Sequence, residues 1–143
     1  MKILRDCVDA MTERARLDVP NETCGFFTGL AGVIEQIHPM KNTAAHPRTR
    51  YEFEPLEHFK FLKRMDRECV PILGVYHSHP ASEAYPSQTD VDRAMLPDGT
   101  PTYSDYVYLI LSLADASPVI RAFRIRQGGI IVEEDLLTAE SRR

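Results

Sequence analysis

The chain has 143 residues, 43% of them hydrophobic and 27% charged, and this composition predicts one folded domain over residues 1–143. A formal net charge of −4 argues against nucleic acid as a partner, because phosphate binding requires a basic surface. No apolar run approaches the roughly 20 residues that cross a bilayer, and the N-terminus has no signal-peptide pattern. We therefore expect no membrane partner and a cytoplasmic location.

The first third of the chain predicts a helix followed by a hairpin. Hydrophobic residues recur at helical spacing over residues 3–17, which indicates an amphipathic helix that ends before Pro20. Two apolar-rich strands are expected over residues 24–30 and 33–41, with a short turn between them.

A polar loop over residues 42–49 leads to an alternating segment, residues 50–54, that predicts a half-buried strand. Pro55 is expected to begin a second helix, because proline suits the first helical position. The apolar face of that helix is predicted to carry Leu56, Phe59, Leu62 and Met65.

The second half of the chain predicts a central strand, a short helix and further strands. The apolar run 70–76 indicates the central strand, and Ser87 suits the N-cap of a helix over residues 88–94. The remaining strands are expected over residues 106–113, 119–125 and 130–132. Residues 136–143 are expected to be a flexible tail.

The three cysteines, Cys7, Cys24 and Cys69, are an odd number without C-x-x-C spacing, so they are interpreted as reduced structural thiols.

The stretch from His77 to Asp90 carries the strongest chemical signal. His77 and His79 directly follow the buried run, and side chains two apart on a strand point to the same face. Two imidazoles and the Asp90 carboxylate, with a fourth position left for water, are the ligand set of a hydrolytic zinc site.

This spacing, H-x-H, seven residues, S, two residues, D, resembles the JAMM motif of the MPN-domain metallopeptidases. Residues 20–29 resemble the family's upstream P-x-E-x-C-G-x-x-x-G signature. The resemblance implies an α+β fold, a curved mixed sheet packed between helices and related to cytidine deaminases. It also implies one Zn²⁺ per chain on His77, His79 and Asp90. Glu22 would be the general base rather than a ligand, and Ser87 the donor to the oxyanion.

Simpler interpretations remain open for some of these residues. Ser87 is also a good N-cap, and Asp90 suits the first turn of a helix. Ser78 should point to the opposite face of the strand and be structural. His38, His46 and His58 are interpreted as surface or core histidines. Neither the helical H-E-x-x-H signature nor the C-x-x-C of zinc deaminases occurs.

By resemblance, the substrate is a ubiquitin-like sulfur-carrier protein of the ThiS, MoaD or CysO kind, cleaved after its C-terminal Gly-Gly to release cysteine or another amine. Two alternatives stay open, a protease for another bacterial ubiquitin-like modifier and a non-catalytic MPN scaffold. A homodimer is compatible with this interpretation. Residues 42–50 and 81–86 are expected to line the substrate groove. The stretch 95–106 looks longer than in small bacterial members and is expected to change that groove.

Overall fold

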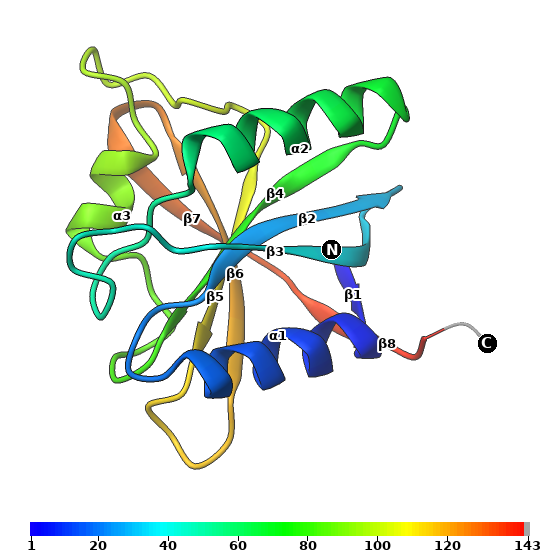
Figure 1. The fold of residues 1–143 in the computed structure, drawn as a ribbon, viewed down its shortest axis with the longest axis vertical. Helices are drawn as coiled ribbons and strands as arrows, with labels where there is room; N and C mark the ends of the chain where they lie inside the picture. The colour runs from blue at the N-terminus through cyan, green and yellow to red at the C-terminus, as the bar shows by residue number, and fades with distance from the viewer. Residues whose placement is uncertain (142–143) are drawn as a thin grey trace.

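The computed structural model describes residues 1–141, within which eight strands form one mixed sheet in the order β7-β6-β5-β4-β2-β3-β1-β8 (Figure 1). The strands are β1 (Lys2–Leu4), β2 (Cys24–Leu30), β3 (Val33–Met40), β4 (Ile72–His79), β5 (Val107–Ser112), β6 (Val119–Arg126), β7 (Ile130–Glu134) and β8 (Leu137–Ala139). The helices are α1 (Arg5–Asp18), α2 (Pro55–Arg67) and α3 (Gln88–Arg93), and a 3₁₀ turn, η1 (Gln127–Gly129), precedes β7.

Helices cover both faces of the curved sheet, α1 on one side and α2 with α3 on the other (Figure 1). Cys7, Met11 and Ala15 of α1 are buried in a cluster with Phe27 of β2. Across the sheet, a second cluster includes Phe61 and Met65 of α2 with residues of β2, β4 and β5. The α+β architecture, with a mixed sheet packed between helices, is confirmed.

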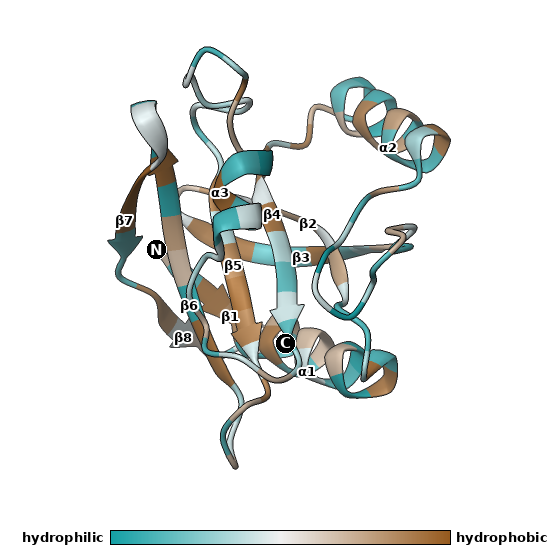
Figure 2. Ribbon diagram, turned by 90° about the vertical axis from the view of Figure 1, so that its left-hand side faces the viewer, coloured by the Kyte–Doolittle hydropathy of each residue, from teal (hydrophilic) through white to brown (hydrophobic). Residues whose placement is uncertain are grey.

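Strand β4 lies inside the sheet and carries two of the candidate metal ligands, His77 and His79. It pairs antiparallel with β2 and parallel with β5, and Figure 2 shows apolar colour along most of β5 beside it. Its final residues, His77, Ser78 and His79, are all buried. The two histidines therefore end a strand that is covered on both sides, as the apolar run before them predicted.

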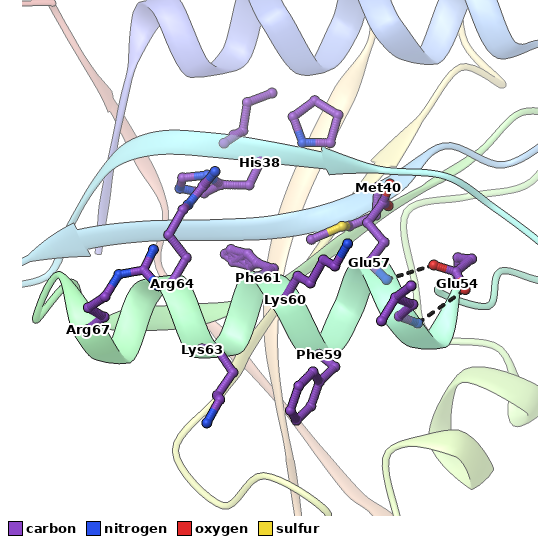
Figure 3. A pocket seen from close by; sticks show the side chains of 13 residues that line it. His38, Met40, Glu54, Glu57, Phe59, Lys60, Phe61, Lys63, Arg64 and Arg67 are labelled. Carbon is purple, nitrogen blue, oxygen red and sulfur yellow. Dashed lines mark hydrogen bonds between the residues drawn. The ribbon is translucent and has the colours of Figure 1, made fainter.

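Helix α2 begins at Pro55, as expected, but buries only part of the predicted apolar face. The Glu54 carboxylate caps its N-terminus by accepting hydrogen bonds from the backbone N–H groups of Leu56 and Glu57 (Figure 3). Phe61 and Met65 are buried, whereas Leu56 and Phe59 are 56% and 57% exposed. The prediction was wrong for Leu56 and Phe59, because the helix turns its Phe61 side toward β2 and β3.

Three other predicted elements differ. The first helix begins at Arg5, because Lys2–Leu4 form β1, which pairs parallel with β3 and β8. Residues 50–54 form no strand and contribute only an isolated bridge from Phe53 to Asn42. Within the expected tail, Leu137–Ala139 form β8, and residues 142–143 lie outside the described residues. The short strands depend on distant partners, which a local pattern does not encode.

The two ends of the sheet are neighbours in the chain. Strand β7 stands at one end and β8 at the other, yet only residues 135 and 136 separate them. The chain thus leads straight from one edge to the other, and the sheet is strongly curled. No helix among residues 1–141 is long and apolar enough to cross a membrane.

Gly74 permits the close approach of β4 to its neighbours. A Cβ built on Gly74 would lie 1.8 Å from the Val107 backbone oxygen and 2.7 Å from the Phe27 ring. Both atoms belong to strands paired with β4, so neither moves without disturbing the sheet that holds the histidines.

We expect Gly74→Ala to lower the free energy of unfolding by at least about 3 kcal/mol, since overpacking against backbone is poorly relieved. Gly32→Ala is the matched control, because Gly32 has a positive φ of 75° but open space around its Cβ position. It should lose only about 1–2 kcal/mol. Urea unfolding measures both, and equal losses would contradict the steric explanation.

Candidate metal centre and active site

The pairing of β2 with β4 brings Glu22 to the histidines. Cys24 is paired with His77 across the two strands. One step further along, the Thr23 N–H donates to Ser78 Oγ (2.8 Å) and the Ser78 N–H donates to the Thr23 carbonyl (3.0 Å). This register places Glu22 beside His79, and because opposed residues share a face, both side chains belong to the α2/α3 side.

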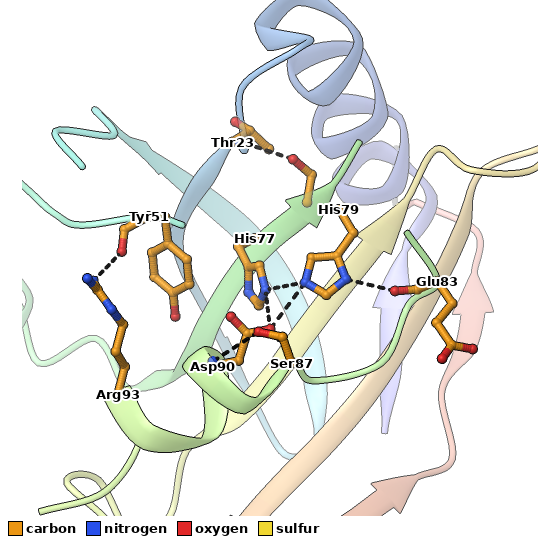
Figure 4. A network of polar contacts seen from close by, with 9 residues as sticks. Thr23, Tyr51, His77, His79, Glu83, Ser87, Asp90 and Arg93 are labelled. Carbon is orange, nitrogen blue, oxygen red and sulfur yellow. Dashed lines mark hydrogen bonds and ion pairs between the residues drawn. The ribbon is translucent and has the colours of Figure 1, made fainter. Parts of the chain in front are cut away.

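Three donor atoms converge at the end of β4 (Figure 4). His77 Nε2 lies 3.0 Å from His79 Nε2, and Asp90 Oδ2 lies 3.1 Å and 3.2 Å from these two nitrogens. All three residues are buried, and they form a cluster that could hold a metal ion. Ligands about 2.0–2.1 Å from a tetrahedral zinc ion lie about 3.3 Å from one another, so the spacing fits.

The hydrogen bonding of His79 supports this fit. Its Nδ1 lies 2.7 Å from the Glu83 carbonyl oxygen, which can only accept, so Nδ1 carries the proton of a neutral ring. Nε2 then presents a lone pair toward the Asp90 carboxylate, and two acceptors face each other. Such an arrangement is unfavourable unless a cation or an extra proton lies between them. A metal ion therefore suits this donor set.

Helix α3 fixes both Ser87 and Asp90 through a capping box. Ser87 Oγ accepts from the Asp90 N–H (3.1 Å), and the Ser87 N–H donates to Asp90 Oδ2 (2.9 Å). The N-cap prediction for Ser87 is confirmed. Because Ser87 Oγ only accepts in this contact, its hydroxyl proton remains free to donate elsewhere. Capping and a catalytic role are thus compatible.

Burial and nearby charge set the protonation of the two carboxyl groups. Burial raises the pKa of Glu22 to about 8, against a smaller lowering effect of His79. Burial also raises the pKa of Asp90, but hydrogen bonding and charge from His77 and the hydrogen bond from the Ser87 N–H hold it well below its usual range. Glu22 Oε1 is buried without a hydrogen-bond partner among the described residues. Such an atom is typical of a site that receives a further group.

Sequence reasoning missed Tyr51 and Arg93. The Tyr51 ring stacks on His77, with centroids 4.7 Å apart at 26°. Arg93 holds this segment against α3 by donating to the Tyr51 carbonyl (2.7 Å) and to Glu52 Oε1 (2.7 Å) (Figure 4). No local motif marks either residue, and the alternating pattern of residues 50–54 suggested a strand instead.

The 42–50 loop reaches Glu22, as its predicted place in the groove requires. The Glu22 N–H donates to the Pro47 carbonyl (2.7 Å), and Asn42 Nδ2 donates to the Glu22 carbonyl (3.0 Å). Asn42 Oδ1 also accepts from the backbone N–H groups of Ala44 and Glu52. Asn42 thereby connects the loop to the backbone that carries Glu22, a second role that the sequence did not indicate.

The remaining sequence interpretations agree with the structure. Ser78 points away from the histidines and bonds to Thr23. Cys7 and Cys24 are buried and free, and burial raises the pKa of Cys24 to about 12, so its thiol stays protonated. Cys69 is free and exposed. His38, His46 and His58 do not join the cluster of His77, His79 and Asp90.

Comparisons with known proteins agree with this geometry. The family model for prokaryotic homologues of the JAB domain matches residues 4–126. The chain is 38% identical over 135 residues to the CysO-cysteine peptidase of Mycobacterium tuberculosis, covering 92% of this chain and 86% of that protein. It is 36% identical over 118 residues to the desampylase of Haloferax volcanii, covering 78% and 80% of the two chains. The solution structure of a protein from Desulfitobacterium hafniense superposes with a TM-score of 0.81 at 32% identity, over 99% of this chain and 94% of that one.

The fold and the buried His77, His79 and Asp90 cluster define a JAMM-type domain, and the chain belongs to the family of prokaryotic JAB-domain proteins. It is a hydrolase of the JAMM type, similar to named peptidases over most of its length.

The raised pKa of Glu22 predicts how the stability of the metal-free protein depends on pH. Between the ordinary value of 4.5 and about 8, the folded state keeps a proton that the unfolded chain releases. Stability should therefore fall as pH rises through this range. Glu22→Gln, which stays neutral, should remove that contribution, so the variant gains stability relative to wild type at the upper end.

Urea unfolding in the presence of EDTA, at about pH 5 and about pH 8, measures this effect. Glu13→Gln on the exposed side of α1 is the control and should not change with pH relative to wild type. An equal Glu22→Gln effect at both pH values would show that burial does not raise this pKa.

Proposed function

We propose that this protein is a zinc-dependent peptidase that hydrolyses the amide bond after the C-terminal Gly-Gly of a ubiquitin-like carrier protein. The observation that carries the proposal is the convergence of Glu22, beside His79, on the three donor atoms at the end of β4. This arrangement supports the proposal, because amide hydrolysis requires a proton acceptor next to the metal ligands.

His77, His79 and Asp90 would hold one zinc ion per chain, leaving a coordination position for water. When bound, zinc lowers the pKa of its water toward about 7 and polarises a carbonyl oxygen. The Glu83 carbonyl orients the His79 ring, and the Tyr51 ring covers His77. These contacts hold both imidazoles in place for the ion.

Glu22 acts as general base and then as general acid. Its carboxylate takes a proton from the attacking water as the new C–O bond forms, and it passes that proton to the nitrogen as the C–N bond breaks. The products are a free carboxylate at the Gly-Gly end and a free amine. The high pKa caused by burial would impede the first step, and a cation held by the neighbouring His77, His79 and Asp90 would lower it.

Ser87 stabilises the oxyanion of the tetrahedral intermediate. Its oxygen is held by the Asp90 N–H, and its own proton is free to donate to the developing charge. Because the capping box fixes the hydroxyl before substrate arrives, little reorganisation is needed.

The choice of a Gly-Gly tail rests on steric reasoning and on the relatives. A narrow approach to a buried metal cluster favours residues without a Cβ. One relative is named for a CysO-cysteine substrate and another is named a desampylase, which supports a ubiquitin-like carrier as the substrate class. A sulfur carrier that releases cysteine is the first candidate, and a different modifier is the second. The cytoplasmic location and a homodimer stay predictions.

Purified protein should contain about one zinc ion per chain, and His77→Ala/His79→Ala should abolish zinc binding, since a single protein ligand then remains. His46→Ala removes an exposed histidine outside the cluster and should keep the zinc. Elemental analysis provides the measurement. Stoichiometric zinc in the double variant would place the ion elsewhere.

A carrier–cysteine adduct should be cleaved rapidly only when the carrier ends in Gly-Gly. Adducts ending in Gly-Ala or Ala-Gly should react ~10²-fold more slowly, because a Cβ displaces the scissile carbonyl by about 1 Å. Glu22→Gln should keep the zinc and lose ~10²–10⁴-fold in rate. Mass spectrometry of the products follows the reaction. Equal cleavage of all three adducts would leave a zinc hydrolase without tail specificity.

A further inference from the structure

A cavity of about 460 Å³ is lined in part by Tyr51, whose ring stacks on His77. We call it the Tyr51 pocket; its main lining side chains are Tyr51, Phe53, His58, Arg93, Tyr103 and Tyr108. Five separate parts of the chain build it, namely residues 51–58 leading into α2, strand β4, the end of α3, residues 102–103 and strand β5.

Strand β4 gives the position of this pocket relative to the reacting bond. Val75 lies in the pocket lining, two residues before His77 and on the same face. Residues two apart on a strand are separated by about 7 Å. Two residues of an extended substrate also span about 7 Å. The substrate residue two positions before the one that carries the scissile carbonyl therefore reaches the Tyr51 pocket.

The position of Glu22 decides which side of the scissile bond occupies the pocket. Glu22 lies beside His79, at the opposite end of the cluster from Val75 along β4. Because Glu22 delivers the proton to the leaving amine, the amine belongs on the His79 side. The carrier tail therefore extends the other way, toward Val75, and its third residue from the C-terminus faces the pocket.

The lining selects an uncharged, bulky side chain. Aromatic rings form most of the wall, and the guanidinium of Arg93 at the rim is already paired with Glu52 at 2.7 Å. No unpaired charge of Arg93 is thus available to attract an acidic side chain. The volume accommodates a leucine or an aromatic residue, and burying such a side chain against aromatic rings is favourable.

The 95–106 stretch supplies an outer wall. The Thr102 N–H donates to the Ala94 carbonyl (2.9 Å), which ties this stretch to the end of α3. Tyr103 stacks on Tyr106, with centroids 4.3 Å apart at 15°, so its ring is held in place. The segment that looks longer in the sequence is therefore a side of the pocket.

We propose that the Tyr51 pocket is a specificity pocket for the residue immediately before the Gly-Gly end of the carrier, and that it selects a large uncharged side chain there. This inference rests on the proposed function and adds to it a preference at a defined position of the tail.

The test uses carrier–cysteine adducts with leucine, alanine or aspartate immediately before Gly-Gly. Wild-type enzyme should prefer leucine over alanine by about 10–100-fold in kcat/KM, and aspartate should be poorest. Tyr103→Ala should reduce the leucine-to-alanine ratio to a few-fold while leaving the zinc content unchanged. Tyr103→Phe should restore the ratio. Phe59→Ala removes an exposed aromatic side chain outside this pocket and should keep the wild-type ratio (Figure 3).

A binding measurement separates this inference from the proposed function. Isothermal titration with carriers ending in Leu-Gly-Gly or Ala-Gly-Gly, the expected products, requires no cleavage. One outcome is that wild type cleaves no adduct but binds the leucine carrier more tightly, and that Tyr103→Ala removes that difference. This outcome would support the specificity pocket and contradict the proposed peptidase activity. If cleavage occurs and neither kcat/KM nor affinity depends on the tail residue, or if Tyr103→Ala leaves the preference intact, the pocket inference is overturned.

Discussion

The antiparallel pairing at the end of β2 and β4 determines where the reacting groups meet. Two hydrogen bonds between Thr23 and Ser78 extend the ladder just beyond the last paired residues and thereby align Glu22 with His79. A shift of one residue would turn Glu22 to the α1 face of the sheet and separate it from the histidines. The positions of Glu22 and of the two histidines thus depend on one register, although about 55 residues of sequence separate them.

The contacts among His77, His79 and Asp90 are locally unfavourable and are held in place by the rest of the fold. His79 Nε2 and Asp90 Oδ2, both acceptors, lie 3.2 Å apart in a buried place where water cannot relieve their repulsion. The capping box of α3 and the paired β4 hold the donors from two sides. The rest of the fold therefore offsets the destabilising effect of these close acceptors, and a cation bound between them would stabilise the folded protein.

The sequence predicts the parts of this site that obey short-range rules. The spacing of His77 and His79 follows strand periodicity, and Ser87 follows the chemistry of helix caps, so both could be placed without a structure. Residues 50–54 alternate like a strand, but they have no neighbouring strand to pair with and instead lie against α3. Strand β8 at Leu137–Ala139 consists of three residues whose partner stands at the other end of the chain. Only tertiary contacts define such elements, and the stacking of Tyr51 on His77 belongs to the same class.

The pairing of β8 with β1 has a consequence for the order in which the protein is made. Strand β1 leaves the ribosome well before its partner β8, and the Leu137 N–H donates to the Met1 carbonyl. The elements that carry His77, His79 and Asp90 emerge earlier, because Asp90 precedes β8 by about one third of the chain. During synthesis the nascent chain thus holds its reactive centre in a sheet whose β1 edge is still open. The unpaired backbone groups of an open edge can pair with other chains. Because β1 has only three residues, few such groups are exposed.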